Sequence, residues 1–246
     1  MPRNVFVTAT PQMHFPQYAL PYPHWMNQHL EQHGYAIIPK ILSADEIQRL
    51  SVALGATDGA GRRGLLTDPV VSHFAHSPKL IDLVRPHLPS EPRPVRAIYF
   101  NKTAEANWLV AWHQDLTIAV REQIETPGYT AWSVKDGIPH VQPPVEFLQN
   151  MLTIRIHLDD CDETNGALRV LAGTHKFGRL GAQEIEELRS RYPEHLCTLA
   201  AGDVLLMRPL LLHASSRSLG LRQRRVLHLE YAGFTLPATL AWNTAA

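Results

Sequence analysis

The chain has 246 residues, 45% of them apolar, which is enough for one sizeable domain with a buried core. Lys+Arg and Asp+Glu balance at 23 each, so charge gives no reason to expect a nucleic-acid or membrane partner. The two cysteines lack CxxC spacing, and we find no signal peptide and no membrane-length apolar run, so we expect a protein of the reducing cytoplasm.

The N-terminal part predicts helices around a single strand. Residues 1–22 are interrupted by prolines, and we expect an arm laid over the domain. Ser43 with Glu46 three residues later forms a capping box, and Ser77 before Pro78 is a second helix start. Helices are therefore expected at 24–34, 43–54 and 77–88, and a strand at 35–39.

From Val95 onward the pattern changes to short strands separated by turns. Strands are expected at 95–102, 108–115, 151–160, 166–173, 195–202, 204–215 and 224–233, with one helix at 182–192. Strands at this spacing favour a sandwich or barrel, so the fold class is mainly β with flanking helices.

Residues 121–150 form a long insertion between two of these strands. Loops of this length in compact domains are usually functional or disordered, and this one carries Tyr129, Trp132 and Phe147. We therefore expect an ordered, lid-like segment within a single domain spanning 1–246. Trp132 and His140 are candidate substrate contacts there, although either side chain can equally serve to anchor the loop.

The stretch AWHQDLTIAV, residues 111–120, places a histidine and an acid two positions apart in a strand-like run. Residues i and i+2 of a strand share one face, so His113 and Asp115 would converge on one point. His213, at the end of an apolar strand, would complete a 2-His-1-carboxylate triad, which suits non-haem Fe(II) oxygenases. An isolated HxD also fits an ordinary surface strand, so the later residues decide the interpretation.

A basic cluster, LRQRR, follows His213. Arginine is the natural bidentate partner of a carboxylate, so a guanidinium near an iron site suits a cosubstrate with a carboxylate at its far end. Arg224 and Arg225 compete for this role, because strand alternation allows only one to point into the barrel. His228 has the same parity as Arg224, and a satisfied buried histidine is the simpler interpretation of it.

Taken in order, these motifs resemble the phytanoyl-CoA dioxygenase family of Fe(II)/2-oxoglutarate oxygenases over roughly residues 30–235. The resemblance rests on HGYAIIPKILSADEIQRL, WHQD, LTIRIHLDDCDETNGALRVLAGTHKFG and HASSRS followed by RQRR. Thr174 stands where the family usually has serine. The resemblance implies a double-stranded β-helix, a cupin-like jelly-roll barrel.

The resemblance also implies roles for individual residues. His113, Asp115 and His213 would bind Fe(II). Arg224, helped by Ser215, would bind the distal carboxylate of 2-oxoglutarate, with Lys102 or Asn101 nearby. O2 would be the second cosubstrate, and the expected reaction is hydroxylation of an unactivated C–H bond of a small organic molecule, with release of succinate and CO2. The family's halogenating branch replaces the acid that Asp115 provides here.

Two other classes stay open at this level. One is a cupin-like metalloprotein that does not use 2-oxoglutarate, and the other is a catalytically inactive binding module. Nothing in the sequence names the substrate, separates a free acid from a CoA thioester, or indicates the oligomeric state.

Overall fold

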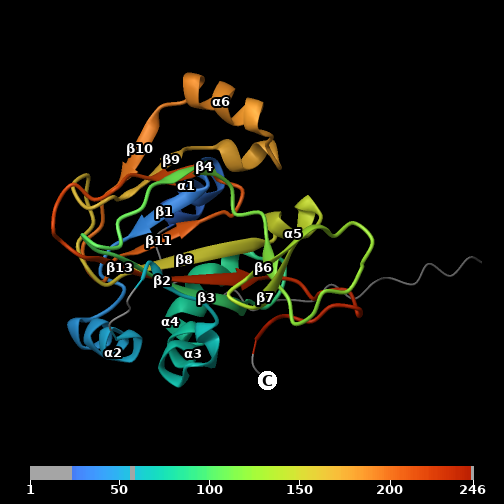
Figure 1. Cartoon of the computed structure of the whole chain (residues 1–246), viewed down its shortest axis with the longest axis horizontal. Coiled ribbons are helices and arrows are strands. Elements are labelled where there is room, and N and C mark those ends of the chain that lie inside the picture. Colours follow the sequence, from blue (N-terminus) through green and yellow to red (C-terminus); the bar gives the residue numbers. More distant parts are fainter. Residues whose placement is uncertain (1–23, 56–58, 245–246) are drawn as a thin grey trace, which may run out of the picture.

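The computed structural model describes residues 24–55 and 59–244 (Figure 1). The arm expected for residues 1–22 lies outside this part of the chain. None of the helices in the described ranges is long and apolar enough to cross a membrane.

The four helices that the sequence predicts all begin within one residue of the expected positions. Helix α1 ends at His33 before Gly34, whose φ of 83° is accessible to glycine without strain. The capping box of α2 is complete, because Glu46 N donates to Ser43 Oγ and Ser43 N donates to Glu46 Oε2. The helices are α1 His24–His33, α2 Ala44–Leu54, α3 Pro69–Ala75, α4 Pro78–Val84, α5 Val145–Gln149 and α6 Ala182–Arg191.

Helix α3 was not predicted from the sequence. It is only two turns long, and its start depends on local contacts: Asp68 accepts hydrogen bonds from the Val70 and Val71 backbone, and Pro69 occupies the first helical position.

The larger sheet is antiparallel in all its pairings and has the order β1-β11-β8-β13-β3-β2. Its strands are β1 Tyr35–Ile38, β11 Val204–Met207, β8 Met151–His157, β13 Arg224–Ala232, β3 Arg93–Lys102 and β2 Gly61–Arg62.

The second sheet has the order β10-β9-β12-β4. Its strands are β10 Glu194–Cys197, β9 Leu168–Leu171, β12 His213–Ser215 and β4 Val110–His113. The single strand expected at 204–215 is wrong, since β11 and β12 belong to different sheets. The physical reason is Pro209, which has no N–H for a sheet ladder; a turn in which Leu211 N donates to Arg208 O redirects the chain.

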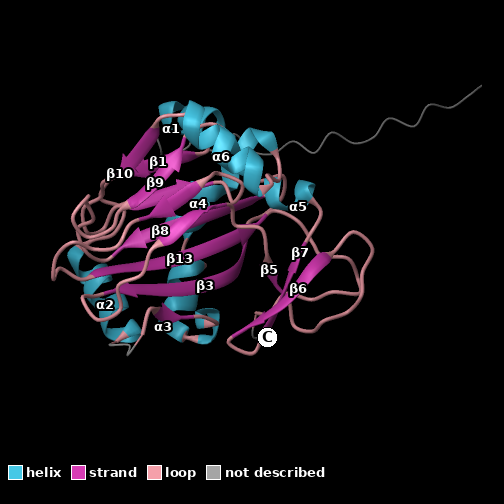
Figure 2. Cartoon of the chain, turned by 45° about the horizontal axis from the view of Figure 1, so that its top comes forward, coloured by secondary structure: helices cyan, strands magenta, loops and turns pink. Residues whose placement is uncertain are grey.

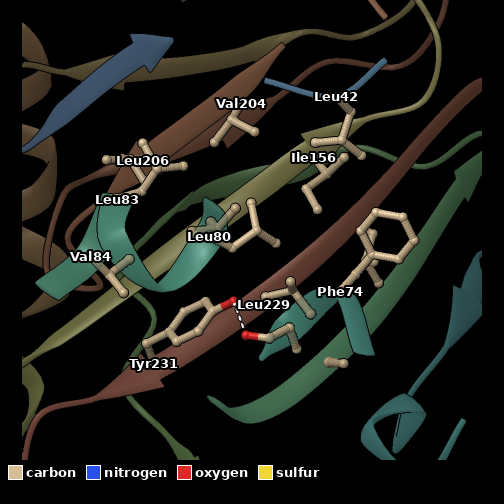
Figure 3. Packing of buried hydrophobic residues seen from close by; sticks show 14 of the residues in the cluster. Leu42, Phe74, Leu80, Leu83, Val84, Ile156, Val204, Leu206, Leu229 and Tyr231 are labelled. Carbon is tan, nitrogen blue, oxygen red and sulfur yellow. Dashed lines mark hydrogen bonds between the residues drawn. The ribbon is translucent and has the colours of Figure 1, made fainter. Parts of the chain in front are cut away.

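The two sheets and their flanking helices form the jelly-roll architecture, so the predicted fold class is confirmed (Figure 2). Helices α3 and α4 cover the outer face of the six-stranded sheet. Their apolar side chains, such as Phe74 and Leu80, pack against the outward-facing residues of β8, β11 and β13 (Figure 3). The hydroxyl of Tyr231 donates to Ala75 O in this layer.

The space between the sheets differs from one end to the other. Near β1, β11 and β9 it is filled by apolar side chains, including Val170, Leu205 and Met207. Between β3, β13 and β8 on one side and β4 and β12 on the other, it opens into a cavity of about 190 Å³. The fold therefore places a hollow next to the two strands that carry His113 and His213.

The segment 121–150 contains regular secondary structure. It contributes β6 Thr130–Lys135, β7 Ile138–Gln142 and α5, and a small sheet forms in the order β5-β7-β6 with β5 Ile118–Ala119. Tyr129 and Phe147 pack in one apolar cluster with Trp242 from the end of the chain. At its turn, Asp136 pairs with Arg63, a residue of the cavity wall (2.6 Å).

Candidate active site

Two histidines and one aspartate converge on the wall of the cavity. Their ligand atoms all lie within 4.8 Å of one another. Nε2 of His113 is 3.8 Å from Asp115 Oδ1, and Nε2 of His213 is 3.7 Å from Asp115 Oδ2. His113 and His213 are direct partners across β4 and β12, which explains why residues so far apart in sequence meet here.

The orientation of both histidine rings is fixed by the backbone. Nδ1 of His113 is 2.8 Å from Ala111 O, and Nδ1 of His213 is 2.8 Å from Leu211 O. A carbonyl only accepts, so each Nδ1 carries a proton, and each Nε2, on the side of the Asp115 carboxylate, is the ring atom available to a metal ion. This is the pattern by which backbone carbonyls orient histidine ligands of metals.

Asp115 reaches the site from a loop. The sequence predicted a strand through Asp115, but β4 ends at His113, so the shared-face argument for the pair is wrong in detail. The backbone takes another partner at this point, because Asp115 N donates to Pro209 O (2.9 Å) instead of continuing a ladder. The carboxylate still faces the histidines.

The protonation states suit metal binding. Burial acts to raise the pKa of Asp115, but the neighbouring histidines, His213 first, outweigh it and hold that pKa well below its usual range. Burial lowers the pKa of His213 to about 4, against the opposing effect of Asp115. At neutral pH the site therefore offers a carboxylate and a neutral imidazole, the forms that ligate metals.

The donor set also fits a metal ion chemically. Asp115 Oδ2 is buried and has no hydrogen-bond partner, although a buried carboxylate oxygen normally has one. An ion held by Asp115, His113 and His213 would satisfy that oxygen and leave coordination positions open toward the cavity. Two nitrogens and one carboxylate are the ligand set typical of non-haem Fe(II).

The two candidate arginines at the start of β13 point to opposite faces of the sheet, as strand alternation requires. Arg224 is 3% exposed and lines the cavity, whereas Arg225 turns to the other face and forms a two-point ion pair with Asp159. Arg224 donates to Gly166 O (2.7 Å), and its Nε has no partner. A buried guanidinium without a carboxylate is suited to receive one from a ligand.

Ser215 lines the cavity, while Lys102 lies just behind it. Lys102 is fully buried, donates to Ser216 O (2.6 Å) and is 3.5 Å from Ser215 Oγ. Burial, followed by the charge of Arg224, lowers the pKa of Lys102 to about 7. Asn101 has the opposite parity, and its side chain accepts a hydrogen bond from Gln223.

Trp132 and His140 are not among the residues that line this cavity. Trp132 packs at the edge of the apolar cluster of the segment 121–150. His140 is buried, with Nδ1 2.9 Å from Ile138 O, and faces a smaller hollow that it shares with Arg63 and Arg96. The structure therefore does not bring them together with the triad.

Arg155 and Arg96 line the cavity and were missed from the sequence. Arg155 sits in β8, where every residue is buried, and it donates to His228 Nδ1 (3.0 Å). Arg96 pairs with Glu230 (3.1 Å), which also contacts His228 Nε2 (3.2 Å). His228 is therefore a satisfied cavity residue. A lone arginine within the apolar run MLTIRIHL was the available signal.

An antiparallel jelly-roll whose cavity presents two histidines and a carboxylate defines a non-haem iron oxygenase. The particular family follows from the sequence: a model of the phytanoyl-CoA dioxygenase (PhyH) family matches residues 30–226, and the chain belongs to that family. The protein is accordingly an Fe(II)- and 2-oxoglutarate-dependent dioxygenase, with O2 as cosubstrate.

Solved structures of low sequence identity share the fold. EctD from S. alaskensis with 2-oxoglutarate and 5-hydroxyectoine has a TM-score of 0.68 at 22% identity, covering 87% of this chain and 77% of that one. The carbocyclase SnoK from nogalamycin biosynthesis has a TM-score of 0.67 at 16% identity, and the match covers 89% of this chain and 87% of that one. HygX from Streptomyces hygroscopicus with nickel and 2-oxoglutarate gives 0.62 at 18%, covering 86% of each chain.

Proposed function

We propose that the protein hydroxylates an unactivated C–H bond of a small organic molecule, with conversion of 2-oxoglutarate and O2 to succinate and CO2. The observation that carries the proposal is the convergence of His113, Asp115 and His213 in a cavity that also holds the guanidinium of Arg224, which has no carboxylate partner within the described residues. Iron, once bound with 2-oxoglutarate and O2, supplies the oxidising chemistry.

The chain's own residues bind and orient. His113, Asp115 and His213 would hold the metal on one side and leave its other side open to the cavity. Arg224 would bind the distal carboxylate of 2-oxoglutarate, with Ser215 beside it and Lys102 behind Ser215. The carboxylate of Asp115 supports hydroxylation over halogenation, because a halogenase of this family lacks the acid.

The segment 121–150 would act as the lid over the substrate. One contact between this segment and the cavity wall is the ion pair between Asp136 and Arg63, so a substrate that touches Arg63 would also act on the segment. The buried Arg224 argues against a cupin-like enzyme without 2-oxoglutarate, since such an enzyme has no need of a carboxylate-binding guanidinium there.

The test is succinate formation by Fe(II)-loaded protein given 2-oxoglutarate and O2. Many oxygenases of this class turn over slowly without their prime substrate, so a slow rate is expected. Asp115→Ala should lower this rate by more than about 100-fold, since even indirect support of a ligand affects metal sites 10–100-fold. The matched control is Asp45→Ala, an exposed acid on α2, which should leave the rate unchanged. Equal rates in all three proteins would refute the proposed site.

A further inference from the structure

Two inward-facing arginines lie on adjacent strands of the six-stranded sheet. In the register of β13 with its neighbours, Arg224 stands opposite Lys102 on β3, and His228 stands opposite Arg155 on β8. Between these two pairs along β13, and on the same face of the sheet, Val226 stands opposite Phe100 on β3. The backbones of Arg155 and Arg224 are thus separated by four residues along β13.

The side chain of Arg155 shortens this separation. Its guanidinium carbon lies 5.5 Å from the ring centre of Phe100, which places the charged group across β13 on the β3 side. Burial and then the charge of Arg224 lower the pKa of Arg155, so the two guanidiniums are close enough to repel each other. The hydrogen bond to His228 Nδ1 holds the Arg155 guanidinium there, and because arginine only donates, His228 must accept through Nδ1. His228 in turn contacts Glu230, and Glu230 contacts Arg96, so a chain of polar contacts fixes the guanidinium.

Four arginines line the cavity within the described residues, and they differ in their partners. Arg63 is paired with Asp136, and Arg96 with Glu230. Neither Arg155 nor Arg224 has a carboxylate partner within the described ranges, and the Nε atoms of both are buried without a hydrogen bond. Burying two guanidiniums without a carboxylate partner in the wall of one cavity is unfavourable unless a ligand anion joins them.

We propose that Arg155 is a second cosubstrate-binding guanidinium, which holds the distal carboxylate of 2-oxoglutarate together with Arg224. The inference rests on the proposed function, since it assigns a further residue to that site. A carboxylate has two oxygens and about four acceptor positions, so it can serve two guanidiniums at once. Arg155 then sets the preference for a dicarboxylic 2-oxo acid over a monocarboxylic one.

The experiment measures equilibrium binding of two 2-oxo acids to Ni(II)-loaded protein, by calorimetry or tryptophan fluorescence, so no turnover is needed. The ligands are 2-oxoglutarate and 2-oxopentanoate, which keeps the metal-binding end but lacks the distal carboxylate. Arg155→Gln should weaken the binding of 2-oxoglutarate by about 10- to 100-fold, the range for a hydrogen bond to a charged group. The affinity for 2-oxopentanoate should stay within about twofold of the wild-type value.

Further variants keep the result interpretable. Arg155→Lys retains the charge without the planar guanidinium, so its affinity for 2-oxoglutarate should lie between those of the wild type and Arg155→Gln. Arg208→Gln removes another largely buried arginine, which pairs with Glu31 away from the cavity, and should bind both ligands as the wild type does. Thermal unfolding shows whether each variant is folded. The double variant with Arg224→Gln should lose less than the product of the two single effects, because both residues bind one carboxylate.

Each outcome has one meaning. A selective loss of 2-oxoglutarate binding supports the inference. An unchanged 2-oxoglutarate affinity in folded Arg155→Gln overturns it and points to a role toward the prime substrate. Equal weakening of both ligands also overturns it, because Arg155 would then act on the metal-binding end. If wild-type protein binds neither acid, the proposed function itself fails.

Discussion

The two faces of strand β13 show how one stretch of chain serves two purposes. Its outward residues Leu227, Leu229 and Tyr231 are fully buried against the helices. Its inward residues Arg224 and His228 line the cavity. Both faces are equally inaccessible, yet one is apolar and the other is charged.

This difference separates stability from ligand binding. Apolar side chains on the outer face stabilise the fold by leaving water and packing closely. Arg224 on the inner face loses hydration without a carboxylate partner in the protein, so we expect a ligand carboxylate to provide one. Substitutions on the two faces of β13 should therefore change different measurements.

The largest effect is expected from Leu229→Ala on the outer face. Truncation leaves a cavity beneath the helices, so the free energy of unfolding should fall by about 2–5 kcal/mol. Urea denaturation measures this change. The affinity of the remaining folded protein for 2-oxoglutarate should stay the same; a parallel loss of affinity would show that the two faces are not independent.

The inner face should give the opposite result with Arg224→Gln. The loss of a charge-assisted contact should weaken 2-oxoglutarate binding by about 10- to 100-fold in calorimetry. Stability should not decrease, because the substitution removes a buried charge that has no carboxylate partner. Arg225→Gln, which breaks the pair with Asp159 outside the cavity, is the matched control and should bind 2-oxoglutarate normally.

Two buried histidines, His157 on β8 and His213 on β12, should also make the metal-free protein sensitive to acid. Burial lowers the pKa of His157 well below 6.5 and that of His213 to about 4. As the pH falls below 6.5, the unfolded chain therefore binds protons before the folded one, and stability is lost down to the folded-state pKa. Between pH 7.5 and 5.5 each ring should cost about 1 kcal/mol in urea denaturation with chelator present.

The variant that tests this assignment is His157→Leu, which should reduce the slope of stability against pH. An unchanged slope would mean that histidines elsewhere in the chain govern the acid sensitivity.

The smallest effect is expected from Tyr231→Phe. This change keeps the packing of the ring and removes only the hydrogen bond to Ala75 O, so unfolding should become easier by about 1 kcal/mol. A much larger loss, measured by the same denaturation, would mean that the ring itself has moved.

Much of this arrangement was predictable from periodicity and motif. Alternation along β13 predicted that only one of Arg224 and Arg225 faces the cavity, and the structure places Arg224 there, because Arg225 pairs with Asp159 on the other face. The capping box at Ser43 was confirmed, since its contacts are local in sequence. The family resemblance also brought His113 and His213 together correctly, although they are paired only through the sheet register.

What was not predictable depended on contacts between distant segments. Arg155 is one charged residue in an otherwise apolar strand. Its place in the cavity follows only from the pairing of β8 with β13, which puts it opposite His228. The end of β4 before Asp115 depends on Pro209, nearly a hundred residues later. Trp132 and His140 were chosen for their chemistry, but the packing of the segment 121–150 directs them elsewhere.

The redirection at Pro209 has a consequence for folding. Residues 208–212 are all that separate β11, in the core sheet, from β12, which carries His213. Such a short connection links the two sheets closely, so we expect the strand that carries His213 to open in the same cooperative unit as the core. The backbone amides of β12 should therefore exchange with solvent as slowly as those of β11, and lose their protection in the same event.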